Sequence, residues 1–433
     1  MNTGIEINFF EPHAPEAIYY GKLYLDAEGK NYLEFQDNIV KHKFDPIKAA
    51  FATDVHSNEQ YSLINCAFNQ TDFKTFRYRI HEIYKGAYLD KVTDNNCISA
   101  EARMTHLSSW INYPRLLPKV SSSIHEPSSI VLKEQFIATF NVNENTSLEL
   151  SEFCAESFNK REVVLKNVGY IRFSSDIPIS RLELYHHVSG FLKLLSIFTD
   201  TTPKLTQLEF TLNSERVVEL LFPEKLKMVQ DETDPLLDYK KMEDLWPVII
   251  NNFYAERNKF VKVLNLLIES LENKTAEVSF LNSTTAFEIY HKYFFEQEIA
   301  IQQQLSLELF NRKIIQHKPN KWIQIVRYYH ILDIVKDFDF FKAHFTDIDK
   351  VLIMMIDSRN YYTHYSETKN KIWTPNQLLY INLVLRQVLK AAILKKLGLS
   401  ELLINKLLNN RSAYFYHNYE KNEYSLNYLP PNE

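Results

Sequence analysis

The chain has 433 residues, of which 45% are hydrophobic and 24% are charged, and its formal net charge is −5. This composition is typical of a folded globular protein with room for two or three domains, and it argues against a disordered chain. Only seven glycines are present, which nearly excludes glycine-built phosphate loops. The net negative charge excludes a surface that attracts nucleic acid over its whole extent.

The cysteines and the N-terminus indicate the compartment. Cys66, Cys97 and Cys154 are odd in number and far apart, which argues against a disulfide framework and against a paired-cysteine zinc site. The first residues, MNTGIEINFF, lack the basic and apolar regions of a signal peptide. We find no run of the ~18 uncharged apolar residues that a membrane span needs. We therefore expect a cytoplasmic protein without a membrane partner.

The N-terminal half has the patterns of β-structure. Residues 18–90 carry short aromatic and β-branched runs separated by turn residues. Alternation in 22–25, followed by the turn sequence DAEGKN, predicts a hairpin. Further strands are predicted in 135–142 and 161–173, and a helix is predicted over 179–198.

The C-terminal half changes to the helical period, with apolar residues recurring at three and four positions. The last strong helix is predicted to start with Thr374 as N-cap and Pro375 in the first turn, and to stop at Gly398. Four or five helices with short connections indicate an antiparallel bundle. We therefore predict an α+β protein with a β-rich domain over residues 1–228. An all-α bundle with an aromatic C-terminal tail follows over residues 229–433.

The sequence IDSRNYYTHYS contains the strongest candidate site, Arg359-Asn360-x-x-x-His364, at the end of an apolar run. Histidine can act as acid or base near neutral pH, and arginine offers a planar fork of donors to phosphate oxygens. Asn360 can orient the histidine or bind the phosphate. RNA carries its own nucleophile, the 2′-hydroxyl. The set predicts RNA cleavage without metal or cofactor, leaving a 2′,3′-cyclic phosphate and a 5′-hydroxyl.

The spacing of the motif restricts its geometry. On an ideal helix, Arg359 and His364 lie about 140° apart, so they do not share a face. Asn360 and His364, four residues apart, do share one. Either the helix loosens near its end, or a second copy of the motif completes the site across a two-fold axis.

Spacing alone is weak evidence, because Arg181 and His186 have the same separation. We rank Arg359 above Arg181 because Asn360 follows it and because it closes an apolar helix. The competing interpretation is a solvated helix end, with an arginine near the negative end of the helix dipole.

A metal site is a second alternative. Histidines and aspartates gather in the stretch 330–347, and the first two members can share a helix face. Aspartates on a helix surface or loop are more often only solvated, and we expect no bound metal. The candidate ligands are His330, Asp333, Asp337, Asp339, His344 and Asp347.

Aromatic residues suggest two further surfaces. Those of the tail, residues 414–428, can stack on bases or pack as a cover on the bundle. The stretch FKTFRYRIH, residues 73–81, can face a nucleic acid or protein ligand. The simpler interpretation is a strand whose basic residues alternate outward.

The motif and its surroundings resemble a known family. RNYYTH resembles the RNxxxH motif of HEPN ribonuclease domains. Residues 280–294, FLNSTTAFEIYHKYF, and residues 385–400, LRQVLKAAILKKLGLS, are similar to helices of Apea-like HEPN domains. YYGKLYLDAEGKNYLEF, QYSLINCAF and ISAEARMTHLSSWI resemble the ApeA N-terminal domain in pattern.

The resemblance implies a bacterial anti-phage protein that acts by abortive infection. Its N-terminal domain would sense or regulate, a phage-encoded trigger would release the nuclease, and host RNA, with transfer RNA or other single-stranded loops as candidates, would be cleaved. HEPN domains usually build one active site from two motifs in a homodimer.

The resemblance also implies roles for four residues. Arg359 would bind the phosphate, His364 would be the acid or base, Asn360 would be the polar residue beside them, and Glu288 would support the motif from a neighbouring helix. The alternative is a non-catalytic HEPN-like module for dimerisation or interaction.

Overall fold

The structure is a computed structural model of the whole chain, which divides into two compact units. Residues 1–195 and 203–240 form the first, and residues 196–202 and 241–433 the second. The boundary expected at residue 228 falls in 223–237, outside the described residues. The structure describes residues 4–25, 31–36, 46–72, 75–89, 95–111, 134–159, 162–199, 201–222, 238–273, 275–314, 323–344, 347–364 and 372–408.

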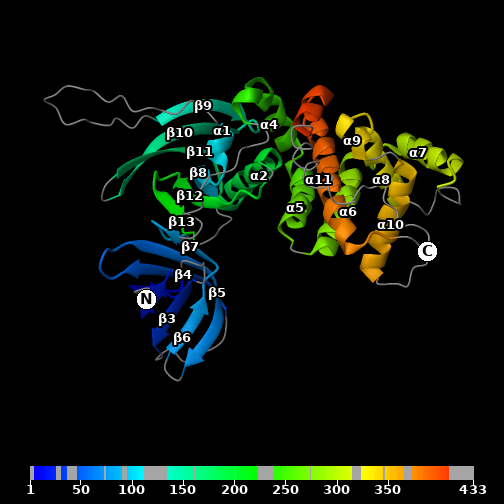
Figure 1. Cartoon of the computed structure of the whole chain (residues 1–433). Coiled ribbons are helices and arrows are strands. Elements are labelled where there is room, and N and C mark those ends of the chain that lie inside the picture. Colours follow the sequence, from blue (N-terminus) through cyan, green and yellow to red (C-terminus); the bar gives the residue numbers. More distant parts are fainter. Residues whose placement is uncertain are drawn as a thin grey trace, which may run out of the picture. The chain divides into compact units, whose positions relative to one another are not determined.

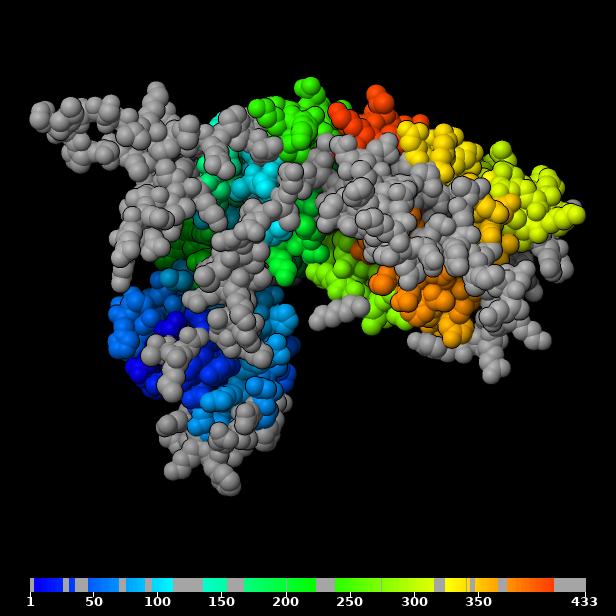
Figure 2. Space-filling view, in the orientation of Figure 1, coloured from blue at the N-terminus to red at the C-terminus, as the bar shows by residue number. Residues whose placement is uncertain are grey.

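The first unit begins with a small closed barrel (Figure 1), whose described residues are drawn in shades of blue in both Figure 1 and Figure 2. Its strands pair in the antiparallel order β4-β1-β2-β3-β6-β5, and β5 also pairs with β4, which closes the ring. The predicted hairpin is confirmed as β2 and β3, with Leu23 opposite Leu33. The strands are β1 (Ile5–Phe10), β2 (Tyr19–Tyr24), β3 (Tyr32–Gln36), β4 (Ile47–Asp54), β5 (Gln60–Asp72) and β6 (Thr75–Arg79).

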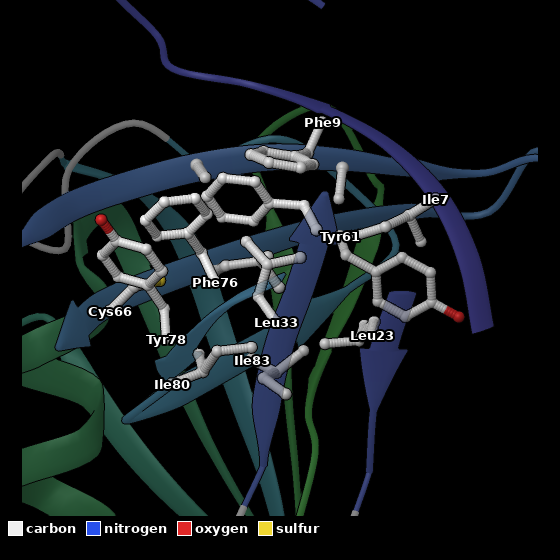
Figure 3. Packing of buried hydrophobic residues seen from close by; sticks show 14 residues of the cluster. Ile7, Phe9, Leu23, Leu33, Tyr61, Cys66, Phe76, Tyr78, Ile80 and Ile83 are labelled. Carbon is white, nitrogen blue, oxygen red and sulfur yellow. The ribbon is translucent and has the colours of Figure 1, made fainter. Parts of the chain in front are cut away.

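Strand alternation fills the barrel with apolar side chains (Figure 3). Ile7, Leu33 and Leu63 are fully buried there. On β6, Phe76 and Tyr78 are buried in the same cluster. The intervening arginines alternate to the other side of the strand, because successive side chains of a strand point to opposite faces. This arrangement matches the simpler interpretation of the stretch 73–81, of which residues 73 and 74 lie outside the described residues.

The sheet continues from the barrel through a second set of antiparallel strands. The order from β5 is β7-β13-β12-β8-β11-β10-β9, and the strands predicted in 135–142 and 161–173 are present. The elements are β7 (Glu82–Lys85), β8 (Asn95–Met104), α1 (Leu107–Ile111), β9 (Glu134–Asn141), β10 (Thr146–Asn159), β11 (Glu162–Ser180), α2 (Arg181–Thr199), β12 (Leu205–Leu212) and β13 (Val217–Leu220).

Helix α1 packs closely on strand β11. A Cβ atom at Gly169 would lie 2.7 Å from Ile111 Cδ1 and 3.2 Å from Leu107 Cγ, so only glycine lets the helix approach this far. Trp110 of α1 is buried and meets Phe191 of α2 edge to face. Helix α2 starts two residues later than predicted, because β11 runs on to Ser180.

The second unit is a helical bundle, and the α+β class predicted for the chain is confirmed. The described residues form more helices than the four or five predicted. Helix α6 is central, because it packs against α5, α8, α10 and α11. The elements are the 3₁₀ helix η2 (Lys240–Leu245), α4 (Trp246–Ala255), α5 (Arg257–Glu272), α6 (Ala276–Phe295), α7 (Ile299–Asn311), α8 (Ile323–Val335), α9 (Asp339–His344), α10 (Ile348–His364) and α11 (Pro375–Lys396).

The ends of α11 are those predicted. Thr374 and Gln377 form a reciprocal capping box, and Gly398 has a φ of +102° just beyond the helix. By length and composition alone α11 could cross a membrane, but 72% of its apolar stretch is buried inside the bundle, as in a core helix. The aromatic tail lies outside the described residues.

Candidate functional site

The motif lies on the last two turns of α10, which is regular through His364. The helix therefore does not loosen, and Arg359 and His364 remain on different faces. Arg359 and Asn360 are half-buried and His364 is exposed. Ile353, with 44% of its surface exposed, shares the face of Asn360 and His364, seven and eleven residues further along.

The opposite face of α10 is fixed by the segment that leads into α11. The Tyr362 hydroxyl donates to the Trp373 carbonyl at 2.7 Å, and the Trp373 amide donates to Ser358 Oγ at 2.9 Å. Phe280 of α6 packs edge-on against both aromatic rings. These buried contacts set the rotation of α10, and so they decide that the motif faces outward.

Glu288 of α6 lies beside the motif arginine. Its Oε1 is 3.7 Å from Arg359 Nε. The same oxygen accepts hydrogen bonds from Tyr328 Oη and Gln324 Nε2 of α8, each at 2.6 Å. Arg359 Nη1 donates weakly to Asn360 Oδ1, at 3.5 Å. Three helices therefore converge on one carboxylate next to the guanidinium.

Sequence reasoning named Glu288 but missed Gln324 and Tyr328. Their signal is a polar pair one turn apart on α8, in a helix that is otherwise largely buried. Burial, with the Glu288 carboxylate beside it, raises the pKa of Tyr328 well above 10. The phenol therefore keeps its proton and acts as a donor to Glu288.

The other arginine with the same spacing does not form such a site. Arg181 is 99% buried, with its guanidinium 4.6 Å from the ring centre of Tyr84, whereas His186 is exposed on α2. A packed cation and an exposed imidazole do not offer one phosphate two contacts.

The stretch 330–347 does not assemble into a metal site in the part of the chain that the structure describes. His330 is buried, with Nδ1 3.2 Å from His291 Nε2, and burial lowers the pKa of His291 to about 3. Asp333 pairs with Lys336, and Asp347 accepts a backbone amide at the start of α10. Among the described residues, no three His, Cys, Asp or Glu side chains are grouped to hold a metal ion.

Two family models match parts of the chain. The helical unit matches the Apea-like HEPN family over residues 281–402, from within α6 to beyond the end of α11. This range includes Glu288 and the whole motif. The protein is therefore a HEPN domain protein, a class whose members are commonly ribonucleases.

The remainder of the chain identifies the family more narrowly. Residues 7–270, more than half of the chain, match ApeA N-terminal domain 1, a range that also includes α4 and most of α5. The chain therefore belongs to the ApeA-type proteins. The two domains together support an antiviral defence function of the nuclease type. No curated protein and no solved structure matches the chain.

Proposed function

We propose that this protein is a metal-independent endoribonuclease of an anti-phage abortive-infection system. The observation that supports the proposal best is the surface of α10 beyond Ser358. On this surface lie a half-buried Arg359, Asn360 beside it and an exposed His364. The bundle that carries them matches the Apea-like HEPN family. The guanidinium has Glu288 3.7 Å away, beyond hydrogen-bond distance, so donors remain for a phosphate.

In the proposed reaction the RNA 2′-hydroxyl attacks the adjacent phosphorus. A base removes the 2′-proton, and an acid protonates the departing 5′-oxygen, which leaves a 2′,3′-cyclic phosphate and a 5′-hydroxyl. Arg359 stabilises the added negative charge of the transition state, and Asn360 binds a phosphate oxygen or orients the imidazole. No metal or cofactor takes part.

One imidazole cannot be acid and base in the same step, and His364 and Arg359 lie on different faces of a regular helix. We therefore propose a homodimer in which two motifs form one composite site. The exposed Ile353, on the same helix face as Asn360 and His364, supports this arrangement, because an apolar side chain gains by burial at an interface.

The biological part of the proposal follows from the two domains. The N-terminal β-rich domain would sense infection through a phage-encoded trigger and release the nuclease in the bacterial cytoplasm. Host RNA, with transfer RNA loops as the first candidate, would be the substrate, because single-stranded loops let the 2′-hydroxyl align with the scissile bond.

The test incubates purified wild type and His364→Ala with total bacterial RNA in EDTA, and reads fragment lengths and end chemistry. His186→Ala is the matched control, since it removes an exposed histidine with the same spacing from an arginine. We expect cyclic-phosphate ends from wild type and from the control, and a roughly 10²- to 10⁴-fold loss in His364→Ala. Analytical ultracentrifugation of the same samples should show dimers of all three.

Three results would contradict the proposal. The first is cleavage by His364→Ala as fast as by wild type, and the second is cleavage that a chelator abolishes. The third is RNA that stays intact even after infected-cell lysate is added, a result that favours the non-catalytic module.

A further inference from the structure

The contacts of Glu288 Oε1 are unequal. Two neutral donors from α8, the Tyr328 hydroxyl and the Gln324 amide, each lie 2.6 Å from this oxygen. The cation, Arg359 Nε, lies 3.7 Å from it. A carboxylate oxygen offers about two lone-pair sites, so the two α8 donors occupy both.

In this arrangement Glu288 attracts Arg359 by its charge but does not form a hydrogen bond with it through Oε1. At 3.7 Å the guanidinium feels the carboxylate charge but makes no hydrogen bond to that oxygen. The attraction keeps Arg359 near Glu288, and the donors of the guanidinium remain able to bind a phosphate. An arginine tied to Glu288 in a short ion pair would have to break that pair before it could bind substrate.

Tyr328 is well suited to hold the carboxylate in this way. Its side chain is fully buried, and the ring of Phe287 packs edge-on against it. A buried tyrosine has few alternative positions, so its hydroxyl is a fixed donor. The hydroxyl of the next residue, Tyr329, instead donates a hydrogen bond to Glu308 of α7 and accepts one from Arg312. The two tyrosine hydroxyls therefore bond to different parts of the bundle.

We propose that Tyr328 and Gln324 are positioning residues of the nuclease site. By occupying Glu288 Oε1, they keep the guanidinium of Arg359 close to the carboxylate but available to the phosphate. The inference rests on the proposed ribonuclease function. Without the Tyr328 hydroxyl, the freed lone pair of Oε1 takes Arg359 into a direct ion pair and withdraws it from the substrate.

The test measures RNA cleavage by the full chain carrying Tyr328→Phe, Glu288→Gln or both, with Tyr329→Phe as the matched control. We expect kcat to fall about tenfold in Tyr328→Phe, a loss the size of one hydrogen bond, and to stay within twofold in the control. In Glu288→Gln the carboxylate no longer attracts Arg359, so we expect kcat to fall a few-fold. The double variant should be no slower than Glu288→Gln, because the uncharged amide no longer captures Arg359.

Losses that multiply in the double variant would overturn the proposal, since Tyr328 would then act independently of Glu288. A second readout needs no activity: in crystals of Tyr328→Phe, the distance from Arg359 Nε to Glu288 should shorten from 3.7 Å to hydrogen-bond length. An unchanged distance would also overturn it. If wild type does not cleave RNA but the distance shortens, the proposed function fails, and only the control of the Arg359 position by Tyr328 stands.

Discussion

The ionised side chain of Glu152 lowers the free energy of unfolding at high pH, and the size of this effect can be worked out from its surroundings. This residue of β10 is 2% exposed, and its Oε2 has no hydrogen-bond partner. It stands opposite Gly169 in the sheet, on the face that α1 covers. Burial raises the pKa of the carboxyl from 4.5 to about 7.

The sign of the effect follows from the raised pKa. The unfolded chain releases this proton near pH 4.5 and the folded chain near pH 7, so the folded state is most favoured below pH 4.5 and loses stability as the pH rises through 7. Each pH unit corresponds to about 1.4 kcal/mol, so the ionised carboxylate costs about 3 kcal/mol above pH 7. Roughly 2 kcal/mol of that cost develops between pH 5.5 and pH 8.

The perturbation is Glu152→Gln, which keeps the shape and removes the charge. Equilibrium urea unfolding of the full chain at pH 5.5 and pH 8, followed by circular dichroism, measures the free energy of unfolding of each protein. The advantage of the variant over wild type should grow by about 2 kcal/mol between the two pH values. Parallel stability curves would refute the reasoning, because they would mean that Glu152 keeps an ordinary affinity for its proton.

Two further predictions concern the helical unit. Burial and the neighbouring His330 lower the pKa of His291 from 6.5 to about 3, so the unit should lose stability as the pH falls below 6.5. His291→Gln should remove about 2 to 3 kcal/mol of that loss at pH 4.5, as measured by urea unfolding; an equal acid sensitivity in the variant would contradict this. Thr374→Ala should lower the free energy of unfolding by about 1 kcal/mol, because it removes the capping box of α11, whereas Thr374→Ser should be nearly neutral in the same titration.

Local patterns in the sequence predicted several of the elements. Alternation predicted the β2–β3 hairpin, and the capping residues at Thr374 and Gly398 predicted both ends of α11. These signals are short in range, since a strand pattern or a helix cap depends on neighbours within a few residues. The Arg359-Asn360-x-x-x-His364 motif could be found in the sequence for the same reason, because its residues lie within one short stretch.

Contacts between distant segments were decided only by the tertiary structure. Nothing local indicates that β4 pairs with both β1 and β5 to close a barrel, or that Arg181 is buried while Arg359 borders the surface. The meeting of Glu288 with Gln324, Tyr328 and Arg359 joins positions up to 71 residues apart. Such contacts depend on how the buried faces of several helices pack together. The periodicity of a single sequence predicts the buried face of each helix, but it does not predict which other helix packs against that face.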